Sequence, residues 1–251
     1  MNFELLDKLS ELLQENKLER AIELSESKLN ELPTTEFHKV LNKNLLHLKP
    51  NLAIYLESFN SSASNYFKKK PKQKKDGFLK KIFGKKEKEI EFNPNRNLQA
   101  VYCEMNGFSI NYDLWFIDLF AFDFYNGIDL EDLDWLCDFE FDSENSLTIT
   151  GFEELQSAFK NYMENSEKKD ENEKKSMEIC ELIIILKLQE LFKHTFIENK
   201  NKDWTEIPML VTAHDYELIY KVEKSLQTTL YVKPEQSLML DRKVISFLQW
   251  R

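Results

Sequence analysis

A tract of carboxylates is the most concentrated chemistry in this sequence. Residues 97–159 contain fourteen Asp or Glu side chains and no Lys or Arg, and eleven of the acids fall within residues 113–144. Like charges at this density repel one another and oppose a compact state, and no base within the tract neutralises them. An acidic surface of this kind would steer a basic partner and speed its association.

The candidate contact residues lie in the second half of the tract. Acids and phenylalanines alternate over residues 138–142, so a strand there would place three carboxylates on one face and two rings in the core. Trp135 is of the aromatic type that anchors interfaces. We therefore expect a basic protein to bind a surface made of Asp129, Glu131, Asp132, Asp134, Trp135, Asp138, Glu140, Asp142 and Glu144.

Two other interpretations of the tract stay open. The acids can serve only to solubilise an acidic protein, or a few of them can form a metal or catalytic site. Asp118 is the best single candidate for a functional acid, because on a strand it would share a face with Phe116 and Phe120. A buried carboxylate needs a partner or a raised pKa. A hydrogen bond to a loop amide would satisfy it without any function.

Familiar catalytic and cofactor motifs are absent from the sequence, including GxSxG, HExxH, GxxxxGK[ST] and the EF-hand loop. Cys103, Cys137 and Cys180 are widely spaced and form no cluster with histidine that would hold zinc. A catalytic pair such as Cys137 with His214 is conceivable, as in any chain with several residues of both types. We expect a non-catalytic protein without metal or cofactor.

Charge and composition narrow the class of partner. The net charge of −10 and the pI near 5.1 argue against nucleic acid as a partner. The first residues lack the basic and apolar regions of a secretory signal, and no run approaches the roughly 18 apolar residues of a membrane span. With an odd number of cysteines and no disulfide pattern, these features predict a cytoplasmic protein.

Residues 1–66 are predicted to be helical. Apolar residues recur on one helical face over residues 3–13 and again over residues 18–32, before Pro33. Thr34 or Thr35 would cap a third helix. A further short helix is expected over residues 52–59, after Pro50. The stretch from residue 16 to residue 33, with Ala21 at the packing position, resembles the second helix of a tetratricopeptide repeat. One match predicts a single helical hairpin, since such repeats need stacked neighbours.

Residues 67–96 change to a basic composition, with eleven lysines and Arg96 against four acids. Lys68–Lys75 has no apolar residue, so we expect a flexible linker. Within it, Phe78, Leu79, Ile82 and Phe83 can share one helical face opposite lysines. That pattern is typical of weak contact with a membrane surface, here through Lys68–Lys88.

Residues 97–251 are predicted to form an acidic, aromatic α+β domain. Strands are expected at residues 98–105, 114–125, 135–141 and 147–149, with a two-residue turn at Asn106-Gly107 and another turn at Asn126-Gly127. A helix over residues 114–125 stays open as an alternative. Thr150 and Glu153 fit a capping box at the start of a helix. Residues 164–175 read as a loop or frayed helix end, 177–196 as a long helix, 207–222 as a hairpin and 244–250 as an apolar element. The fold class is α+β, with N-terminal helical hairpins followed by a mostly antiparallel sheet and two longer helices.

Three segments carry a family resemblance, namely DWLCDFE at residues 134–140, LTITGFEELQSAF at 147–159 and AHDYELI at 213–219. They resemble acidic proteins of Gram-negative bacteria that are found beside secreted polymorphic toxins and are read as immunity proteins. The resemblance covers residues 97–251 and implies a cytoplasmic inhibitor that occludes the active site of a basic toxin. The alternative is a scaffold or adaptor that uses the helical region and the basic linker. The sequence does not indicate an oligomeric state.

Overall fold

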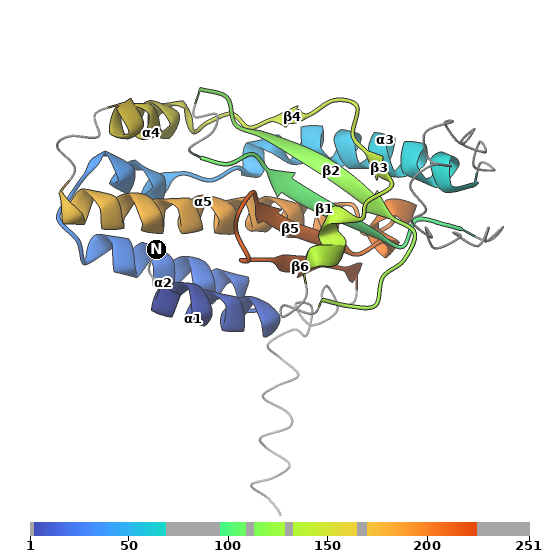
Figure 1. Cartoon of the computed structure of the whole chain (residues 1–251), viewed down its shortest axis with the longest axis horizontal. Helices are drawn as coiled ribbons and strands as arrows, with labels where there is room; N and C mark the ends of the chain where they lie inside the picture. The colour runs from blue at the N-terminus through green and yellow to red at the C-terminus, as the bar shows by residue number, and fades with distance from the viewer. Residues whose placement is uncertain (1–2, 69–95, 109–112, 129–132, 165–169, 225–251) are drawn as a thin grey trace, which may run out of the picture.

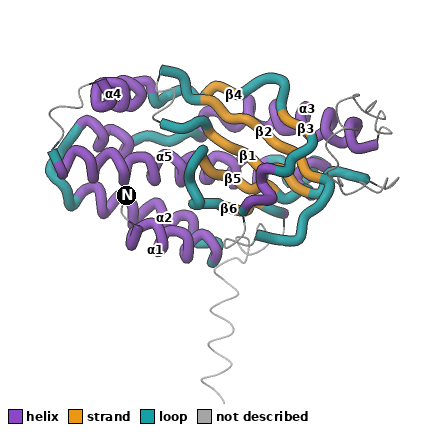
Figure 2. Tube along the Cα trace, in the orientation of Figure 1, coloured by secondary structure: helices purple, strands orange, loops and turns teal. Residues whose placement is uncertain are grey.

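Helices cover one face of a mixed β-sheet, and loops and a short helical turn lie on the other (Figures 1 and 2). The computed structural model describes residues 3–68, 96–108, 113–128, 133–164 and 170–224. The fold is α+β, as the sequence predicts. Most of the basic segment, including Lys69–Lys88, and the predicted element at residues 244–250 lie outside the described residues.

The first two helices match the predicted hairpin. Helix α1 spans Phe3–Gln14 and α2 spans Leu18–Asn30. Between them Asn16 adopts a φ of 56°, a left-handed conformation that asparagine tolerates better than most residues. The Asn16 side chain also accepts a hydrogen bond from the Tyr220 hydroxyl at 2.6 Å, which ties the hairpin turn to the sheet.

The region after Pro33 matches the prediction in part, since Thr35 is the N-cap of the next element but that element is not an α-helix. The third helix is a short 3₁₀ segment, η1 (Glu36–Asn42), followed by η2 (Leu46–Leu48). Helix α3 then spans Lys49–Lys68, far longer than the predicted residues 52–59. Pro50 does not separate elements but lies in the first turn of α3, where its missing N–H leaves no helical hydrogen bond unmade.

Six strands form one sheet within the described residues. They are β1 (Ala100–Met105), β2 (Phe116–Phe122), β3 (Phe141–Asp142), β4 (Leu147–Thr148), β5 (Met209–Ala213) and β6 (Tyr220–Val222). The order is β3-β2-β1-β5-β6, and β4 also pairs with β2. Only the β1–β5 pair among these is parallel, so the sheet is mostly antiparallel as predicted.

Two long elements complete the helical layer. Helix α4 spans Glu153–Glu164, and α5 spans Glu171–Glu198 behind the sheet (Figure 1). The polar residues 171–175, predicted as a loop or frayed end, form the first turns of α5. Asp170 caps this helix by accepting a hydrogen bond from the Glu173 amide at 2.7 Å, which explains how so polar a stretch begins it.

Three local predictions for the strand region are wrong. Residues 135–140 are not a strand, because η4 (Asp134–Cys137) and a bend precede β3. The β1–β2 connection is no two-residue turn, since it runs from residue 106 to residue 115. Asn106 instead bridges its base, accepting from the Phe116 amide at 2.8 Å and donating to the Leu114 carbonyl at 3.1 Å. Glu153 caps α4 through the Gly151 amide at 2.8 Å, not through Thr150.

A single hydrophobic cluster runs from Leu5 to Val222 through the helical side of the sheet. It includes buried residues of both 1–66 and 97–222, so the basic segment does not separate two cores among the described residues. Two buried lysines of α5 extend this connection by pairing with α2: Lys187 with Glu26 at 2.6 Å and Lys193 with Glu19 at 2.5 Å. No helix in the described ranges has both the length and the apolar character needed to cross a membrane.

Candidate functional site

The sheet face turned away from the helices gathers acids and aromatic rings from distant parts of the chain. Glu104 lies opposite Asp118, and Phe120 lies between Tyr102 and Asp142. Their neighbours along each strand belong to the helix-side core, so alternation sends these side chains to the other side. We call this the outer face, and its residues are Tyr102, Glu104, Phe116, Asp118, Phe120 and Asp142.

The segment that contains η4 covers part of the outer face. Trp135 packs with its ring centroid 5.1 Å from that of Phe122 and 5.7 Å from that of Phe124. Leu133 and Leu136 contact the same small cluster, which is built on Tyr102, Phe122, Leu210 and Ile219. Trp135 is therefore half-buried and holds the segment against the sheet.

The remaining described candidates are all exposed, and so are two phenylalanine rings of the same region of the chain. Phe124 and Phe139 are 41% and 39% exposed, and the Phe139 ring leans on Phe120 with centroids 4.6 Å apart. We call these two rings and the exposed candidate acids the acidic surface, and its acids are Asp134, Asp138, Glu140, Asp142 and Glu144. The other three candidates, Asp129, Glu131 and Asp132, lie outside the described residues.

Arg96, which directly precedes the tract, neutralises part of it. Its guanidinium donates hydrogen bonds to Asp123 and Glu140 and lies 5.3 Å from the centre of the Phe67 ring. Arg96 thereby joins α3, the end of β2 and the approach to β3. By contrast, Asp138, Asp142 and Glu144 form no ion pair with any residue that the structure describes.

Asp118 is half-exposed rather than buried, which removes the reason for singling it out. It accepts a hydrogen bond from the Ser146 hydroxyl at 2.6 Å. Its cross-strand neighbour Glu104 accepts from the Tyr102 hydroxyl at 2.8 Å, and its other oxygen lies 2.8 Å from His214 Nδ1. The hydrogen bond to Glu104 raises the pKa of His214.

The Glu104–His214 pair is a polar contact that sequence reasoning missed. The two residues lie at or just beyond the carboxyl ends of β1 and β5, which are parallel and adjacent. They are 110 positions apart in the chain, and only the pairing of those strands could have signalled their contact. No group of three or more metal-ligating side chains occurs in the parts of the chain that the structure describes.

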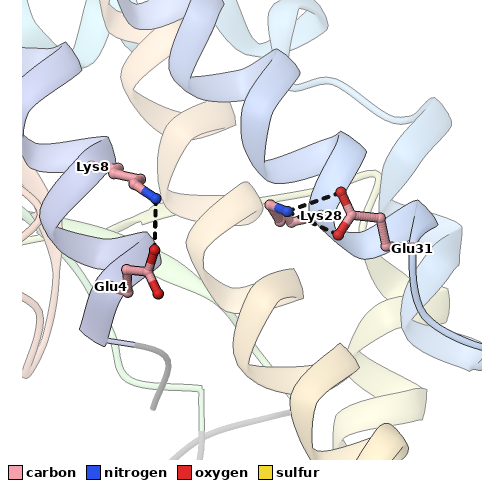
Figure 3. Close-up of polar contacts among 4 residues, drawn as sticks. All are labelled: Glu4, Lys8, Lys28 and Glu31. Carbon is pink, nitrogen blue, oxygen red and sulfur yellow. Dashed lines mark hydrogen bonds and ion pairs between the residues drawn. The ribbon is translucent and has the colours of Figure 1, made fainter.

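Among the clefts on the described surface are three that lie between secondary-structure elements. One of about 300 Å³ lies between α1, α2 and the start of α5, with Leu5, Leu24 and Ile179 in its lining. Figure 3 shows two ion pairs at this cleft, Lys8–Glu4 at 2.7 Å and Lys28–Glu31 at 2.9 Å. A second, of about 580 Å³, lies between α3 and η6 (Asp203–Glu206). The third adjoins the acidic surface.

The acidic surface offers carboxylate oxygens as acceptors and phenylalanine rings as apolar contacts. A basic protein surface complements both kinds of group. Comparison of this chain with protein-family models, curated proteins and solved structures found no match. A proposal for function therefore rests on the arrangement of these side chains and on the resemblance seen in the sequence.

Proposed function

We propose that this chain is a non-catalytic binding protein that recognises a basic protein through its acidic surface. In its most specific form, the proposal is a cytoplasmic immunity protein that neutralises a cognate toxin by occluding it. The observation that carries the proposal is the set of exposed acids in residues 134–144, together with the exposed rings of Phe124 and Phe139. Three of those acids, Asp138, Asp142 and Glu144, have no counterion among the described residues.

The physical advantage of this arrangement is fast and oriented association. Unpaired surface carboxylates attract a basic partner over about one Debye length, roughly 8–10 Å at moderate salt. The two exposed rings then supply apolar area for the contact itself. Trp135 and Arg96 hold the acidic surface in place before the partner arrives, so little ordering entropy is lost on binding.

The immunity assignment rests on two grounds, this surface and the family resemblance of residues 97–251. A toxin that acts on nucleic acid presents a basic active site, and an acidic surface complements such a site. The same acidity disfavours nucleic acid as a partner of this chain. The expected complex is tight and contains one copy of each protein.

Co-purification with the product of the neighbouring gene is the first test. We expect that product to be a toxin and to elute with this chain as a 1:1 complex. An unrelated neighbour that does not bind would contradict the immunity assignment.

Charge reversal tests the surface itself. Glu140 is unsuitable because it holds Arg96, so the test variant is Asp138→Lys with Asp142→Lys. The matched control is Asp7→Lys with Glu11→Lys, which changes the net charge equally on exposed positions of α1. We expect the test variant to associate at least about tenfold more slowly at low salt, and the difference to shrink at high salt. Equal rates for the two variants would rule out steering by this surface.

The N-terminal cleft favours a scaffold or adaptor as the second candidate function. Leucines and Ile179 line this cleft together with charged residues, which include the Lys8–Glu4 and Lys28–Glu31 pairs drawn in Figure 3. This combination suits an amphipathic helix of a partner. In that case Lys8→Glu with Lys28→Glu should abolish partner capture, whereas the Asp138 and Asp142 reversals should not. The opposite result favours the acidic surface.

A further inference from the structure

A small pocket with aromatic walls lies where α3 meets the connection between β3 and β4. Its volume is about 160 Å³, and Tyr55, Phe59 and Phe141 line it. The walls are fixed, because the Phe59 and Phe141 rings pack with centroids 5.6 Å apart and the Tyr55 hydroxyl donates to the Ile117 carbonyl at 3.2 Å. The pocket therefore has rigid aromatic walls.

The polar lining of this pocket consists of hydrogen-bonding oxygens. Ser58 and Ser62 contribute from one face of α3, and Ser143, Glu144 and Asn145 contribute from the β3–β4 connection. Ser143 is anchored to β2, since its amide donates to the Leu119 carbonyl at 2.9 Å and its hydroxyl accepts from the Leu119 amide at 3.1 Å. Glu144 has no ion pair with the described part of the chain, so its negative charge is available.

We propose that this pocket receives an arginine side chain of the protein partner. A guanidinium is planar and carries five N–H donors, which can engage the Glu144 carboxylate and the serine and asparagine oxygens together. The aliphatic stem and the flat face of the cation suit contact with the rings of Tyr55, Phe59 and Phe141. A lysine ammonium has fewer donors and no planar face, so it fits the same lining less well.

The size of the pocket also points to a single side chain. Small-molecule and cofactor sites usually enclose roughly 300–1,000 Å³, whereas this pocket holds about 160 Å³. An extended side chain that enters from a partner needs only this much room. The pocket opens beside Glu144 of the acidic surface, where a basic partner would be drawn in.

Nearby, the chain already binds one of its own arginines through an aromatic ring and carboxylates. Arg96 lies over the Phe67 ring and donates to Asp123 and Glu140. Tyr66 connects this intramolecular arrangement to the pocket, because its ring packs against both Phe67 and Phe141. The pocket offers an aromatic wall and a carboxylate in a similar combination, with no guanidinium from the described residues in it.

The arginine pocket rests on the proposed function for its partner, but it can be tested without one. N-acetyl-arginine amide, N-acetyl-lysine amide and N-acetyl-citrulline amide are titrated into the full chain, and backbone amide shifts are followed by NMR. We expect the arginine probe to shift residues 143–145 and the α3 residues beside them. Citrulline keeps the shape and loses the charge, so it should bind at least about tenfold more weakly.

Variants distinguish binding of the arginine probe in this pocket from general electrostatic attraction to the acidic surface. Glu144→Gln should weaken the arginine probe about fivefold or more, and Ser62→Phe should abolish binding by filling the pocket. The matched control is Glu11→Gln, which removes one charge from an exposed position of α1 outside the pocket lining and should leave binding unchanged. An unchanged spectrum away from the pocket confirms that each variant is folded.

Equal binding of citrulline and arginine, or equal loss in Glu144→Gln and Glu11→Gln, would overturn the arginine pocket. Failure of the pocket and failure of the proposed function give different results. If the probe binds as expected but no basic protein does, the pocket stands and the proposed function falls. If a basic protein binds tightly while the probe does not bind, the function stands and the pocket falls.

Discussion

Glu181 is a carboxylate enclosed in the helix-side core, where it is 8% exposed. Burial raises its pKa to about 7, although the Tyr216 hydroxyl opposes this by donating a hydrogen bond to it at 2.6 Å. In the unfolded chain the same carboxyl titrates near its ordinary value of 4.5. The folded state therefore retains a proton between these two values that the unfolded state releases.

This difference makes stability depend on pH with a definite sign. Because the folded pKa is the higher one, the chain loses stability as pH rises from about 4.5 through about 7. Glu181→Gln keeps an acceptor for Tyr216 and carries no charge. It should raise the free energy of unfolding at pH 8 by up to roughly 3 kcal/mol and change it little at pH 4.5. Urea unfolding at both pH values measures the effect.

The control for Glu181 is Glu11→Gln, which removes an exposed carboxylate of α1. It should change stability by less than about 0.5 kcal/mol at either pH. A Glu181→Gln effect of the same size at both pH values would mean that the buried charge is not its cause.

The segment around η4 acts as one element that covers part of the outer face. Trp135 supplies its largest contact with the sheet, whereas Phe139 projects partly into solvent. We expect Trp135→Ala to lower stability by roughly 2–3 kcal/mol, less than a fully buried Trp would, because the indole is only half-buried. Phe139→Ala should cost less than about 1 kcal/mol and should weaken partner binding instead.

Unfolding experiments and partner affinity together test this division of roles. Phe120, which contacts the Phe139 ring, serves as a control position, since Phe120→Leu should affect both properties only slightly. If Trp135→Ala left stability unchanged while abolishing binding, Trp135 would be an interface anchor and not a support.

The periodicity of apolar residues predicted the helices and strands that bury one face against the core. The helices α1 and α2, the strands β1 and β2 and the β5–β6 hairpin follow from their spacing. The alternation at residues 138–142 failed because Leu133, Trp135 and Leu136 all turn toward the sheet. Their spacing suits one helical turn, and that tertiary contact overrides the pattern that follows it.

The sequence predicted that the acids of the candidate site would be exposed, but it did not predict which residues they would contact. Acids between turns are exposed in most proteins, and the acids of the acidic surface follow this rule. Two contacts depend on strand order and on segments far apart in the chain. They are the ion pair of Arg96 with Glu140 and the contact of Glu104 with His214. No local spacing contains that information, and the small pocket beside Glu144 depends on it equally.

At the scale of the whole molecule, α5 connects the N-terminal helices to the sheet. One side of α5 contacts β5, where Gln189 donates to the Val211 carbonyl at 3.0 Å and to the Leu218 carbonyl at 2.7 Å. Another side packs on α2, where the buried Lys187 meets Glu26. A helix enclosed in this way cannot lose one neighbour without exposing apolar surface and an unpaired charge.

This architecture predicts that the N-terminal helices and the sheet unfold together. Glu26→Leu leaves Lys187 buried without a counterion and should cost roughly 2–3 kcal/mol. Adding Lys187→Met should recover most of that loss, because the pair is then replaced by apolar groups. Helical circular dichroism follows both layers, and the fluorescence of tryptophans such as the fully buried Trp115 follows the sheet side. Both signals should shift by the same amount in each variant, whereas two separated transitions would mean that residues 3–68 fold independently of the sheet.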